Sequence, residues 1–544
     1  MRQPEKQPGN INGEPMEKDT GRVEVSEERL FEAQDCGMSI APWAEEIPDT
    51  PAIISDAGNR TFAELNANAN RLARALRARG LGEDDSIALV CSNRPEFAEV
   101  LFATQRAGMR LTPVNWHLVE EEAGWIINNC EARAVVADAR FARMAAGAVR
   151  QSSRISVRLA VGGDIEGFEP FDQALDDQSA DNLEDPVLGY RMLYTSGTTG
   201  RPKGVVRPKS YQFYRTETTS QAAGYLAGTG QLHLCTGPLY HAAPLAFSIV
   251  MPLIKGIGTV LMGKWDAEET LRLIEQYRIT HTHMVPTMFH RLLALPQQVK
   301  ERYDISSLRF LVHGADICPV ATKNRIIEWF GPVVWEYYSA TEGSVGAVGP
   351  EQWLAKPGTV GKPDEESGVI IVGDDGEQLP SGKSGTVYIR MKPEAGFCYY
   401  KDEEKTAAAT RGQHFTLGDV GYLDEEGFLF LTDRSANLII SGGVNIYPAE
   451  VEAVLIRHDA VRDAAVIGIP DQQWGEEVKA VVELRQPAQA SAELAASLIE
   501  FCRERLAHYK CPRSVDFIES LPRQDNGKLY KRQLREQYRS APDR

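Results

Sequence analysis

Apolar residues recur at helical spacing near the start of the chain. Between residues 62 and 80 they stand at Phe62, Leu65, Ala69, Leu72, Ala75 and Leu76, and the run ends at Gly80. This spacing predicts an amphipathic helix. The short apolar run of residues 86–91 is typical of a buried strand. A second helix is predicted over residues 94–107, with further strands near Leu111 and over residues 134–137.

The same alternation of strand and helix patterns continues through the middle of the chain. Strands are predicted over residues 259–262, 281–285 and 310–312, with a helix over residues 267–277. Alternating elements of this kind favour an α/β fold of parallel sheets covered by helices. After Gly358 the pattern changes to short strands separated by glycines, including residues 369–372 and 385–390. These indicate a small antiparallel or barrel-like subdomain.

The length of 544 residues exceeds what one hydrophobic core usually supports, so at least two domains are expected. The charged turn Asp433-Arg434-Ser435 precedes a fresh pattern of strand and helix. We therefore predict an N-terminal domain over residues 26–433 and a small α+β C-terminal domain over residues 434–544. Residues 1–25 are rich in Gln, Glu, Gly, Asn and Pro, which predicts a disordered tail.

Composition narrows the class of protein. A hydrophobic share of 43% and a charged share of 25% are typical of a soluble globular chain. The net charge of -17 argues against a general affinity for nucleic acid or anionic lipid. The apolar run of residues 244–254 is about half the ~20 residues that span a bilayer, so it predicts a buried helix. Without a signal-peptide pattern, we expect a cytoplasmic protein with no transmembrane segment.

The eight cysteines form no C-x-x-C pair and no Cys/His cluster at zinc-ligand spacing. They are interpreted as reduced thiols that mostly fill the core.

A loop of glycines and hydroxylated residues is the most informative segment. Residues 194–205 read Tyr-Thr-Ser-Gly-Thr-Thr-Gly-Arg-Pro-Lys-Gly-Val. Glycines let backbone N–H groups approach a phosphate, while hydroxyls and a lysine supply further donors and charge. The Walker spacing G-x-x-x-x-G-K-[ST] is not met, because Pro202 stands where its second glycine would fall. A Ser/Thr/Gly-rich turn without a ligand is the alternative.

The string resembles the signature loop of the adenylate-forming superfamily, which includes acyl-CoA synthetases, luciferases and the adenylation domains of nonribosomal peptide synthetases. This resemblance implies a large N-terminal domain and a mobile C-terminal domain. It also implies that the loop binds ATP or AMP through Thr195, Ser196, Gly197, Thr198, Thr199, Gly200 and Lys203.

Two further segments resemble the adenine and magnesium motifs of that superfamily. Tyr338-Ser339-Ala340-Thr341-Glu342 is similar to Y-G-x-T-E, with Ser339 at the usual glycine. The resemblance implies that Tyr338 stacks on adenine, Thr341 contacts the α-phosphate and Glu342 helps to hold Mg²⁺. His313-Gly314-Ala315-Asp316 falls at the adenine-binding loop, where Gly314 and Ala315 are expected to contact the nucleotide. Asp316 is interpreted as the N-cap of a helix before Ile317, or else as a polar contact to the acyl substrate.

The C-terminal third carries the remaining motifs. Asp419, in a stretch similar to T-G-D-x-G, is expected to accept hydrogen bonds from the ribose hydroxyls, and Arg434 to contact the ribose and phosphate side. The run of residues 439–450 resembles the glycine loop of the thioester-forming conformation, which implies a CoA site at Ser441, Gly442 and Gly443. Lys528, in the final motif, is expected to bridge the carboxylate and the α-phosphate during adenylation.

The acyl site and the hinge follow from the same resemblance. His241, in Pro238-Leu239-Tyr240-His241, is expected to position the substrate rather than to transfer protons, because a carboxylic acid is already ionised at neutral pH. The hinge falls at Ala436, where the family usually has Asp or Lys. A mainly small and apolar acyl pocket is predicted from His241, Ala242, Val285, Met288, Asp316 and Tyr337.

These motifs predict an ATP-dependent acyl-CoA ligase that uses ATP, Mg²⁺ and CoA and acts on a fatty or bulky hydrophobic acid. The region of residues 238–342 is similar to bacterial fatty-acyl-CoA synthetases. A stand-alone enzyme that loads a carrier protein is an alternative, and a luciferase-type oxygenase has no support. A non-catalytic ATP-binding homologue would lack Lys528 or Glu342, and both are present. A homodimer is left open.

Overall fold

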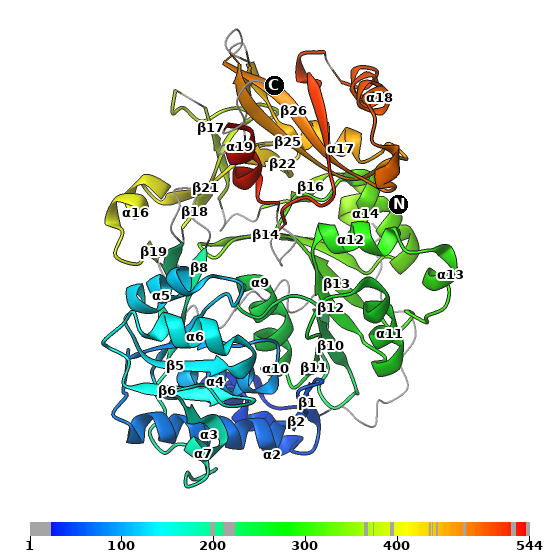
Figure 1. The fold of residues 1–544 in the computed structure, drawn as a ribbon. Helices are drawn as coiled ribbons and strands as arrows, with labels where there is room; N and C mark the ends of the chain where they lie inside the picture. Colours follow the sequence, from blue (N-terminus) through cyan, green and yellow to red (C-terminus); the bar gives the residue numbers. More distant parts are fainter. Residues whose placement is uncertain are drawn as a thin grey trace, which may run out of the picture.

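The computed structural model describes residues 23–195, 202–209, 223–363, 368–373, 375–391, 396–434, 437, 439–441, 444–471, 475–506, 508–523 and 529–539. Two large sheets make up most of the N-terminal part, and a smaller antiparallel sheet adjoins them (Figure 1). A fourth sheet belongs to the C-terminal unit, which lies at the top of the view. The predicted α/β fold with a distinct C-terminal unit is confirmed.

The first large sheet is parallel in its centre and antiparallel at both edges. Its strand order is β15-β14-β13-β12-β10-β11-β1-β2. The strands are β1 (Pro51–Ile54), β2 (Arg60–Thr61), β10 (Leu232–Cys235), β11 (Gly258–Leu261), β12 (His281–Met284), β13 (Phe310–His313), β14 (Val334–Ser339) and β15 (Ser344–Val348). Its helices include α11 (Ala267–Tyr277), α12 (Pro286–Leu293), α13 (Gln297–Lys300), α14 (Val320–Phe330) and α15 (Pro350–Ala355).

The second large sheet has the order β19-β9-β8-β4-β3-β5-β6-β7. Its strands are β3 (Ser86–Val90), β4 (Arg110–Pro113), β5 (Ala132–Asp138), β6 (Val157–Val161), β7 (Glu169–Pro170), β8 (Tyr190–Thr195), β9 (Lys203–Val206) and β19 (Cys398–Tyr399). Among the helices of this part are α3 (Phe62–Ala78), α4 (Pro95–Arg106), α5 (Glu120–Asn129), α6 (Ala142–Val149) and α7 (Phe171–Leu175). Two short helices, α1 (Glu27–Asp35) and α2 (Ala41–Glu46), precede them.

The small antiparallel sheet has the order β16-β22-β21-β18-β17, and β20 pairs with β21. Its strands are β16 (Thr359–Gly361), β17 (Ile370–Val372), β18 (Gly385–Arg390), β20 (Thr410–Arg411), β21 (His414–Leu423) and β22 (Leu429–Arg434), and α16 (Glu403–Ala409) precedes β20. The glycine-separated strands after Gly358 therefore form the antiparallel subdomain that their pattern predicts.

The C-terminal unit is an α+β sandwich around the long hairpin β25 (Val461–Asp471) and β26 (Gly475–Leu484). The strands β23 (Ile439–Ser441), β24 (Val444–Ile446) and β27 (Ser514–Ile518) complete the sheet. Its helices are α17 (Pro448–Leu455), α18 (Ala492–Arg503) and α19 (Lys531–Arg539).

Helices between the two large sheets join them into one core. Helix α3 begins with a capping box in which the Thr61 side chain and Glu64 bond each other's backbone N–H groups, and its periodic face is buried. All twelve residues of α4 are buried. The predicted buried helix is present as α9 (Ala242–Leu245), a π-helical turn (Ala246–Val250) and α10 (Met251–Leu253). Pro252 lies in this segment and has no backbone N–H, so it cannot donate the helical hydrogen bond to the residue four positions earlier.

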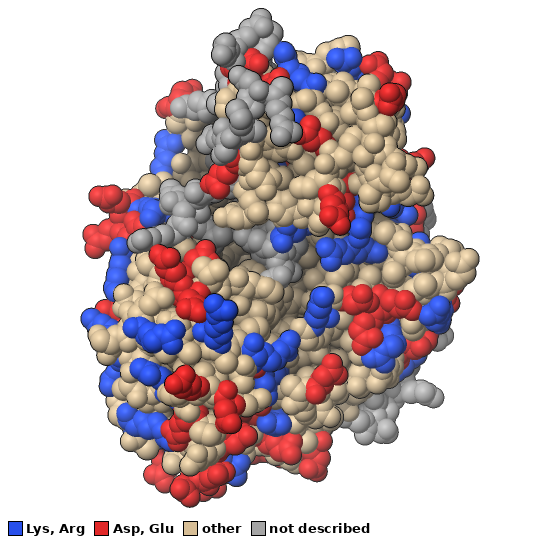
Figure 2. Space-filling view, viewed as in Figure 1, with Lys and Arg blue, Asp and Glu red and all other residues tan. Residues whose placement is uncertain are grey.

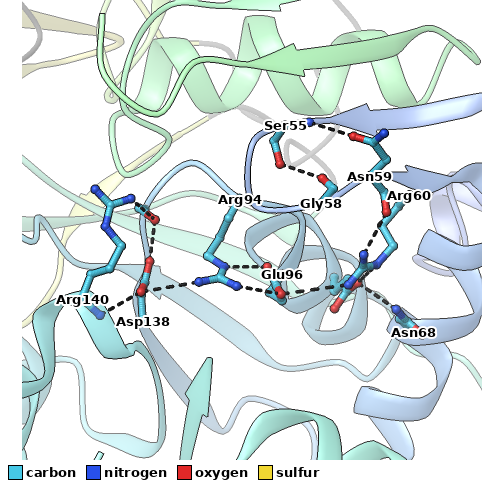
Figure 3. Close-up of polar contacts among 11 residues, drawn as sticks. Ser55, Gly58, Asn59, Arg60, Asn68, Arg94, Glu96, Asp138 and Arg140 are labelled. Atoms are coloured by element: carbon cyan, nitrogen blue, oxygen red, sulfur yellow. Dashed lines mark hydrogen bonds and ion pairs between the residues drawn. The ribbon is translucent and has the colours of Figure 1, made fainter. Parts of the chain in front are cut away.

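Burial of α4 encloses charged side chains, and these are paired in an alternating chain (Figure 3). Arg94 donates to the carboxylate of Glu96 at 2.7 and 3.0 Å, and its Nη1 lies 3.5 Å from Asp138 at the end of β5. Arg60 on β2 donates to Glu99 at 2.7 Å and lies 4.0 Å from Glu96. Because β2 belongs to the first sheet and β5 to the second, this chain of charges connects the two sheets.

No helix among the described residues is long and apolar enough to cross a membrane. All eight cysteines are free thiols, and six of them are buried. Residues 1–22 lie outside the described part, while Val23 bonds Ala227 through its backbone and packs with Val25 against the core.

Candidate active site

The predicted site residues collect at one edge of the first large sheet. Strands β10, β12, β13 and β14 run parallel, so their carboxyl ends lie together. The chain segments that leave these ends contain His241, Val285, Gly314 and Thr341. Open α/β sheets bind ligands outside the carboxyl ends of their strands. The strand order thus places four segments that contain predicted site residues at the same edge of the sheet.

The loop after β13 is held against β14. A Cβ on Gly314 would lie 2.6 Å from the Tyr337 ring and 2.8 Å from the Tyr337 carbonyl oxygen, so only glycine fits. Ala315 has a φ of +71°, a left-handed conformation that costs a residue with a side chain about 1–2 kcal/mol. Non-glycine residues in such conformations are concentrated at functional sites.

Asp316 does not cap a helix, so that interpretation is wrong. Helix α14 begins at Val320 with Pro319 at its N-cap, and the exposed Asp316 carboxylate accepts the neighbouring Ile317 N–H at 2.9 Å. The ring of Pro319 disfavours the α conformation for Cys318. The helix therefore starts after the proline rather than at Ile317.

A buried ion pair lies behind this loop. The Lys323 ammonium of α14 lies 2.6 Å from the Glu336 carboxylate of β14, and the His313 Nε2 lies 3.6 Å from the same carboxylate. Burial lowers the pKa of Lys323 and raises the pKa of Glu336, because each charged form loses water. The pKa of His313 is lowered by burial and by Lys323, so the imidazole is neutral.

The predicted adenine and ribose residues touch each other. The Tyr338 hydroxyl donates to Asp419 Oδ2 at 2.7 Å, and both side chains are buried. Asp419 on β21 lies opposite Arg434 on β22 in the strand register. The small antiparallel sheet therefore carries the predicted ribose contacts to the end of β14.

The turn after β14 accommodates the unusual Ser339. Its hydroxyl donates to the Gly343 carbonyl at 3.2 Å, and the Ala340 N–H donates to the same carbonyl at 2.7 Å. A Cβ on Gly343 would lie 2.3 Å from the Phe415 ring. Serine thus replaces the family's glycine by bonding the turn that presents Thr341 and Glu342.

Glu342 is oriented by a tyrosine from a distant strand. The Tyr399 hydroxyl donates to Glu342 Oε1 at 2.9 Å, and the Lys203 ammonium lies 4.6 Å from the centre of the Tyr399 ring. Burial and the adjacent Glu342 carboxylate raise the pKa of the Tyr399 phenol, so it stays a donor. Strand β19 brings Tyr399 here by pairing with β9, where Tyr399 lies opposite Val205.

Glu342 fits a single-carboxylate magnesium site. A carboxylate oxygen is the hard ligand that Mg²⁺ prefers, and Mg²⁺ beside phosphates usually keeps water and takes only one or two protein carboxylates. The described residues contain no group of three His, Cys, Asp or Glu side chains that could hold a metal without substrate. A Mg²⁺ ion held by Glu342 would supply positive charge next to the phosphates of a nucleotide.

The predicted phosphate loop is preceded by β8 and followed by β9. Strands β8 and β9 pair antiparallel with Thr195 opposite Lys203. The Tyr194 hydroxyl, which donates to Asn129 Oδ1 at 2.5 Å, anchors this strand pair. Ser196, Gly197, Thr198, Thr199 and Gly200 lie outside the described residues, so their predicted contacts stay a prediction.

Aromatic side chains surround the predicted acyl residue Tyr337. His283 Nε2 lies 3.1 Å from the Tyr337 hydroxyl, and the Phe247 ring is parallel to the His283 ring at 5.4 Å. Phe247 and Tyr337 rings are 4.7 Å apart, and Ala243 packs on the same cluster. Burial lowers the pKa of His283 to about 3, so its imidazole is neutral at physiological pH.

The other predicted acyl residues lie nearby but in different surroundings. His241 is the N-cap of α9, with its ring centre 4.4 Å from that of Tyr240. Val285 and Met288 belong to the core between β12 and α14 rather than to the Tyr337 cluster. Asp316 is exposed.

The loop that carries Lys528 begins and ends at described residues. Arg523 pairs with Leu529 through a β-bridge, and the Arg523 guanidinium bonds Asp463 at 2.7 and 2.8 Å. Burial opposes the charge of Arg523, but the bonded Asp463 carboxylate outweighs it and raises the pKa of Arg523, with a smaller contribution from Asp316. Lys528, Ala436, Gly442 and Gly443 lie outside the described residues, and Ser441 ends β23 just before the two glycines.

Comparison with protein families identifies the family of this chain. Residues 40–400 match the model of the AMP-binding enzyme family, and residues 450–528 match the AMP-binding enzyme C-terminal domain. The chain belongs to the AMP-binding enzymes. The resemblance to the adenylate-forming superfamily is thereby confirmed.

Individual relatives of this AMP-binding enzyme are CoA ligases. The chain is 31% identical to indoleacetate–CoA ligase of Aromatoleum aromaticum, over 92% of this chain and 98% of the relative. It is 31% identical to a long-chain-fatty-acid–CoA ligase of Mycobacterium tuberculosis, over 88% and 93%. The crystal structure of the anthranilate CoA ligase AuaEII with anthranoyl-AMP superposes with a TM-score of 0.82, at 25% identity over 92% and 97% of the two chains. The prediction of an acid–thiol ligase is confirmed.

The sequence did not point to three residues that the structure places beside predicted site residues. Tyr399 stands in the stretch Gly-Phe-Cys-Tyr-Tyr, which matches no motif considered above, and only strand pairing brings it to Glu342. His283 and Phe247 lie within predicted elements but carry no signal beyond burial. Their position against Tyr337 depends on the order of strands in the sheet.

Proposed function

We propose that this AMP-binding enzyme activates a carboxylic acid with ATP as an acyl-AMP and transfers the acyl group to CoA. The observation that carries this proposal is the contact of Tyr338 with Asp419 at the end of β14, next to Glu342, Tyr399 and Lys203. The two residues proposed to bind adenine and ribose thus lie beside a carboxylate and a lysine that are suited to the phosphates of ATP.

In the first half-reaction, a carboxylate oxygen of the acid attacks the α-phosphorus of ATP, and pyrophosphate leaves. The acid is ionised at neutral pH, so no general base is required. Negative charge spreads over phosphate oxygens in the transition state, and Lys203, Thr341 and Lys528 are the proposed donors. Mg²⁺ bound at Glu342 would neutralise part of that charge.

In the second half-reaction, the CoA thiol gives up its proton to water, its sulfur attacks the acyl carbon, and AMP leaves with the bonding electron pair. We assign the thiol route to the segment of Ser441, Gly442 and Gly443, which a rotation about Ala436 would bring to the acyl-AMP. His241 is proposed to position the acid in the first step and to leave room for the thiol in the second.

For the acid, the proposal is a bulky hydrophobic group that contains a ring. Tyr337, Phe247 and His283 supply flat surfaces, and Ala243 adds a small apolar side chain to the same cluster. The relatives named for indoleacetate and anthranilate act on aryl acids, and the one named for long-chain fatty acids acts on a flexible chain. Aromatic pairs favour a planar ligand over an alkyl chain.

The test is an assay of AMP release with a panel of acids. Indole-3-acetate, anthranilate, cholate, palmitate and acetate are supplied with ATP and Mg²⁺, each with and without CoA. We expect turnover with at least one ring-bearing acid, and only when CoA is present. Turnover of palmitate alone would reject the ring-bearing substrate, and no CoA-dependent turnover of any acid would reject the ligase assignment.

Loading of a carrier protein is the second candidate. It would give AMP release that depends on an added carrier protein and not on CoA. The relatives named as CoA ligases favour CoA.

A further inference from the structure

A cavity of about 360 Å³ lies between the N-terminal part and the C-terminal unit. Helices α12 and α14 form one wall, and the end of α17, the start of β25 and residues 520–523 form the other. This volume is within the range of small-molecule pockets. Because both units contribute walls, the cavity exists only in this relative arrangement of the two.

Positive charge dominates the cavity lining. Six arginines line it, against three carboxylates at Asp459, Asp463 and Glu483. Figure 2 shows Lys and Arg side chains near the seam between α12 and the C-terminal unit. The whole chain carries a net charge of -17, so this concentration of arginines departs from the rest of the molecule.

Internal ion pairs account for only part of this charge. Arg523 bonds Asp463 at 2.7 Å, and Arg462 lies 3.2 Å from Glu483. The Arg291 guanidinium lies 5.7 Å from the centre of the Trp265 ring.

Besides Arg291, which faces the Trp265 ring, three guanidinium groups remain without a carboxylate. Arg325 of α14 comes from the N-terminal part, and Arg457 and Arg485 come from the C-terminal unit. Within the part of the chain that the structure describes, none of the three makes an ion pair or a side-chain hydrogen bond. Among the described residues that line the cavity, Asp459 is the one carboxylate left to balance them.

The cavity floor adds a neutral imidazole. Burial lowers the pKa of His290, and the nearby Arg523 and Arg485 charges lower it further, while Asp463 opposes them. His290 thus offers a hydrogen bond without adding charge, and the arginines supply the positive field.

We propose that this cavity binds a small anion with two or more phosphate groups, bridged between Arg325 on one side and Arg457 and Arg485 on the other. Guanidinium groups bond phosphate oxygens in pairs with planar geometry, which a point charge cannot do. The ligand class covers free pyrophosphate and the phosphate end of a nucleotide. The predicted phosphate loop and Glu342 belong to the candidate active site. Lys203 of that loop and Glu342 are not among the residues that line this cavity.

Occupancy has a consequence for the reaction. A ligand held by both units binds only this arrangement, so it shifts the equilibrium toward it. If the C-terminal unit rotates between half-reactions, as the proposed function requires, the bound anion slows the CoA step and spares adenylation. Binding itself does not depend on that rotation.

Isothermal titration with the full chain tests binding without any turnover. Pyrophosphate is titrated into the wild type and into Arg325→Gln/Arg457→Gln, without ATP or acid. Each titration is repeated with proteins that also carry Lys203→Gln, because this change is expected to weaken pyrophosphate binding at the predicted phosphate loop. We expect the arginine variant to weaken binding at least tenfold in the Lys203→Gln background. Arg143→Gln, an exposed arginine on α6, is the matched control.

Unchanged binding in the arginine variant, or an equal loss in Arg143→Gln, would overturn the proposal. Arg485→Gln, tested alone, must also weaken binding, which guards against a folding defect in the double variant. Adenosine 3′,5′-bisphosphate replaces pyrophosphate in a second arm. The tighter probe identifies the source of the phosphates, and failure of both to bind rejects the site. These results stand whether or not the enzyme forms acyl-CoA.

Discussion

Tyr399 illustrates why single residues of this site escape sequence reasoning. It lies 57 residues from Glu342 in the chain, and a two-residue strand brings the two side chains together. Glu342, Tyr338 and Asp419 stand in motifs whose order and spacing identify them. Tyr399 stands in none, so its hydrogen bond depends on a pairing between β19 and β9 that no local pattern encodes. The prediction that Asp316 caps a helix was wrong for a local reason, because the helix begins only after Pro319.

Removal of the Tyr399 hydroxyl tests the orientation of Glu342. Tyr399→Phe is expected to raise the Mg²⁺ concentration for half-maximal pyrophosphate release about tenfold, because groups that orient a metal ligand contribute that much to metal affinity. Tyr400→Phe is the matched control, since the Tyr400 hydroxyl donates to Glu131 instead. Equal Mg²⁺ dependence in the wild type and Tyr399→Phe would contradict this role.

At the scale of elements, periodicity predicts the strands and helices well where burial decides them. The helix of residues 267–277 and the strand of residues 385–390 have the predicted bounds. Pattern alone does not reveal the π-helical turn before Met251 or the sheet to which each strand belongs. Those features depend on packing between distant segments.

The ion pair of α14 and β14 should stabilise the elements behind the adenine loop. Lys323→Met is expected to lower the free energy of unfolding by about 3–5 kcal/mol, because Glu336 would remain buried without its cation. Urea unfolding at pH 7 measures this. Lys323→Met/Glu336→Leu should recover most of the loss, and a single variant that costs less than about 1 kcal/mol would contradict the account.

The hinge is a prediction from the sequence alone. Domain rotation needs backbone freedom, which Ala436 permits and a proline would restrict. Ala436→Pro is therefore expected to reduce thioester formation several-fold more than adenylation. Pyrophosphate release and acyl-CoA formation are measured in parallel, and equal losses in both would refute the hinge.

At the scale of the molecule, the sequence predicts two units and their motifs but not how the units meet. The interdomain cavity, with Arg325 on one side and Arg457 on the other, follows from that meeting alone. Burial of whole strands has a further consequence, because the first large sheet encloses four histidines: His233, His281, His283 and His313.

These histidines should make the fold sensitive to acid. Burial lowers the pKa of all four, to about 4 for His281 and about 3 for His283. The unfolded chain then binds more protons below pH ~6.5, so stability is present above that pH and is lost as the pH falls. For His281 and His283, the loss of unfolding free energy between pH 6.5 and 5 is expected to be about 2 kcal/mol each.

Urea unfolding at pH 7 and pH 5 measures this loss. His281→Asn should reduce the difference between the two pH values by about 2 kcal/mol. The exposed His117→Asn is the matched control. A pH dependence that is the same in His281→Asn and the wild type would show that the buried histidine does not contribute.

The most direct test of the central claim is to follow the acyl group by mass spectrometry. The wild type with ATP, Mg²⁺ and its acid is expected to accumulate acyl-AMP, and to convert it to acyl-CoA when CoA is added. Lys528→Ala should lose acyl-AMP formation but still convert supplied acyl-AMP to acyl-CoA. Acyl-CoA formed without an adenylate, or acyl-AMP that CoA does not consume, would contradict the account.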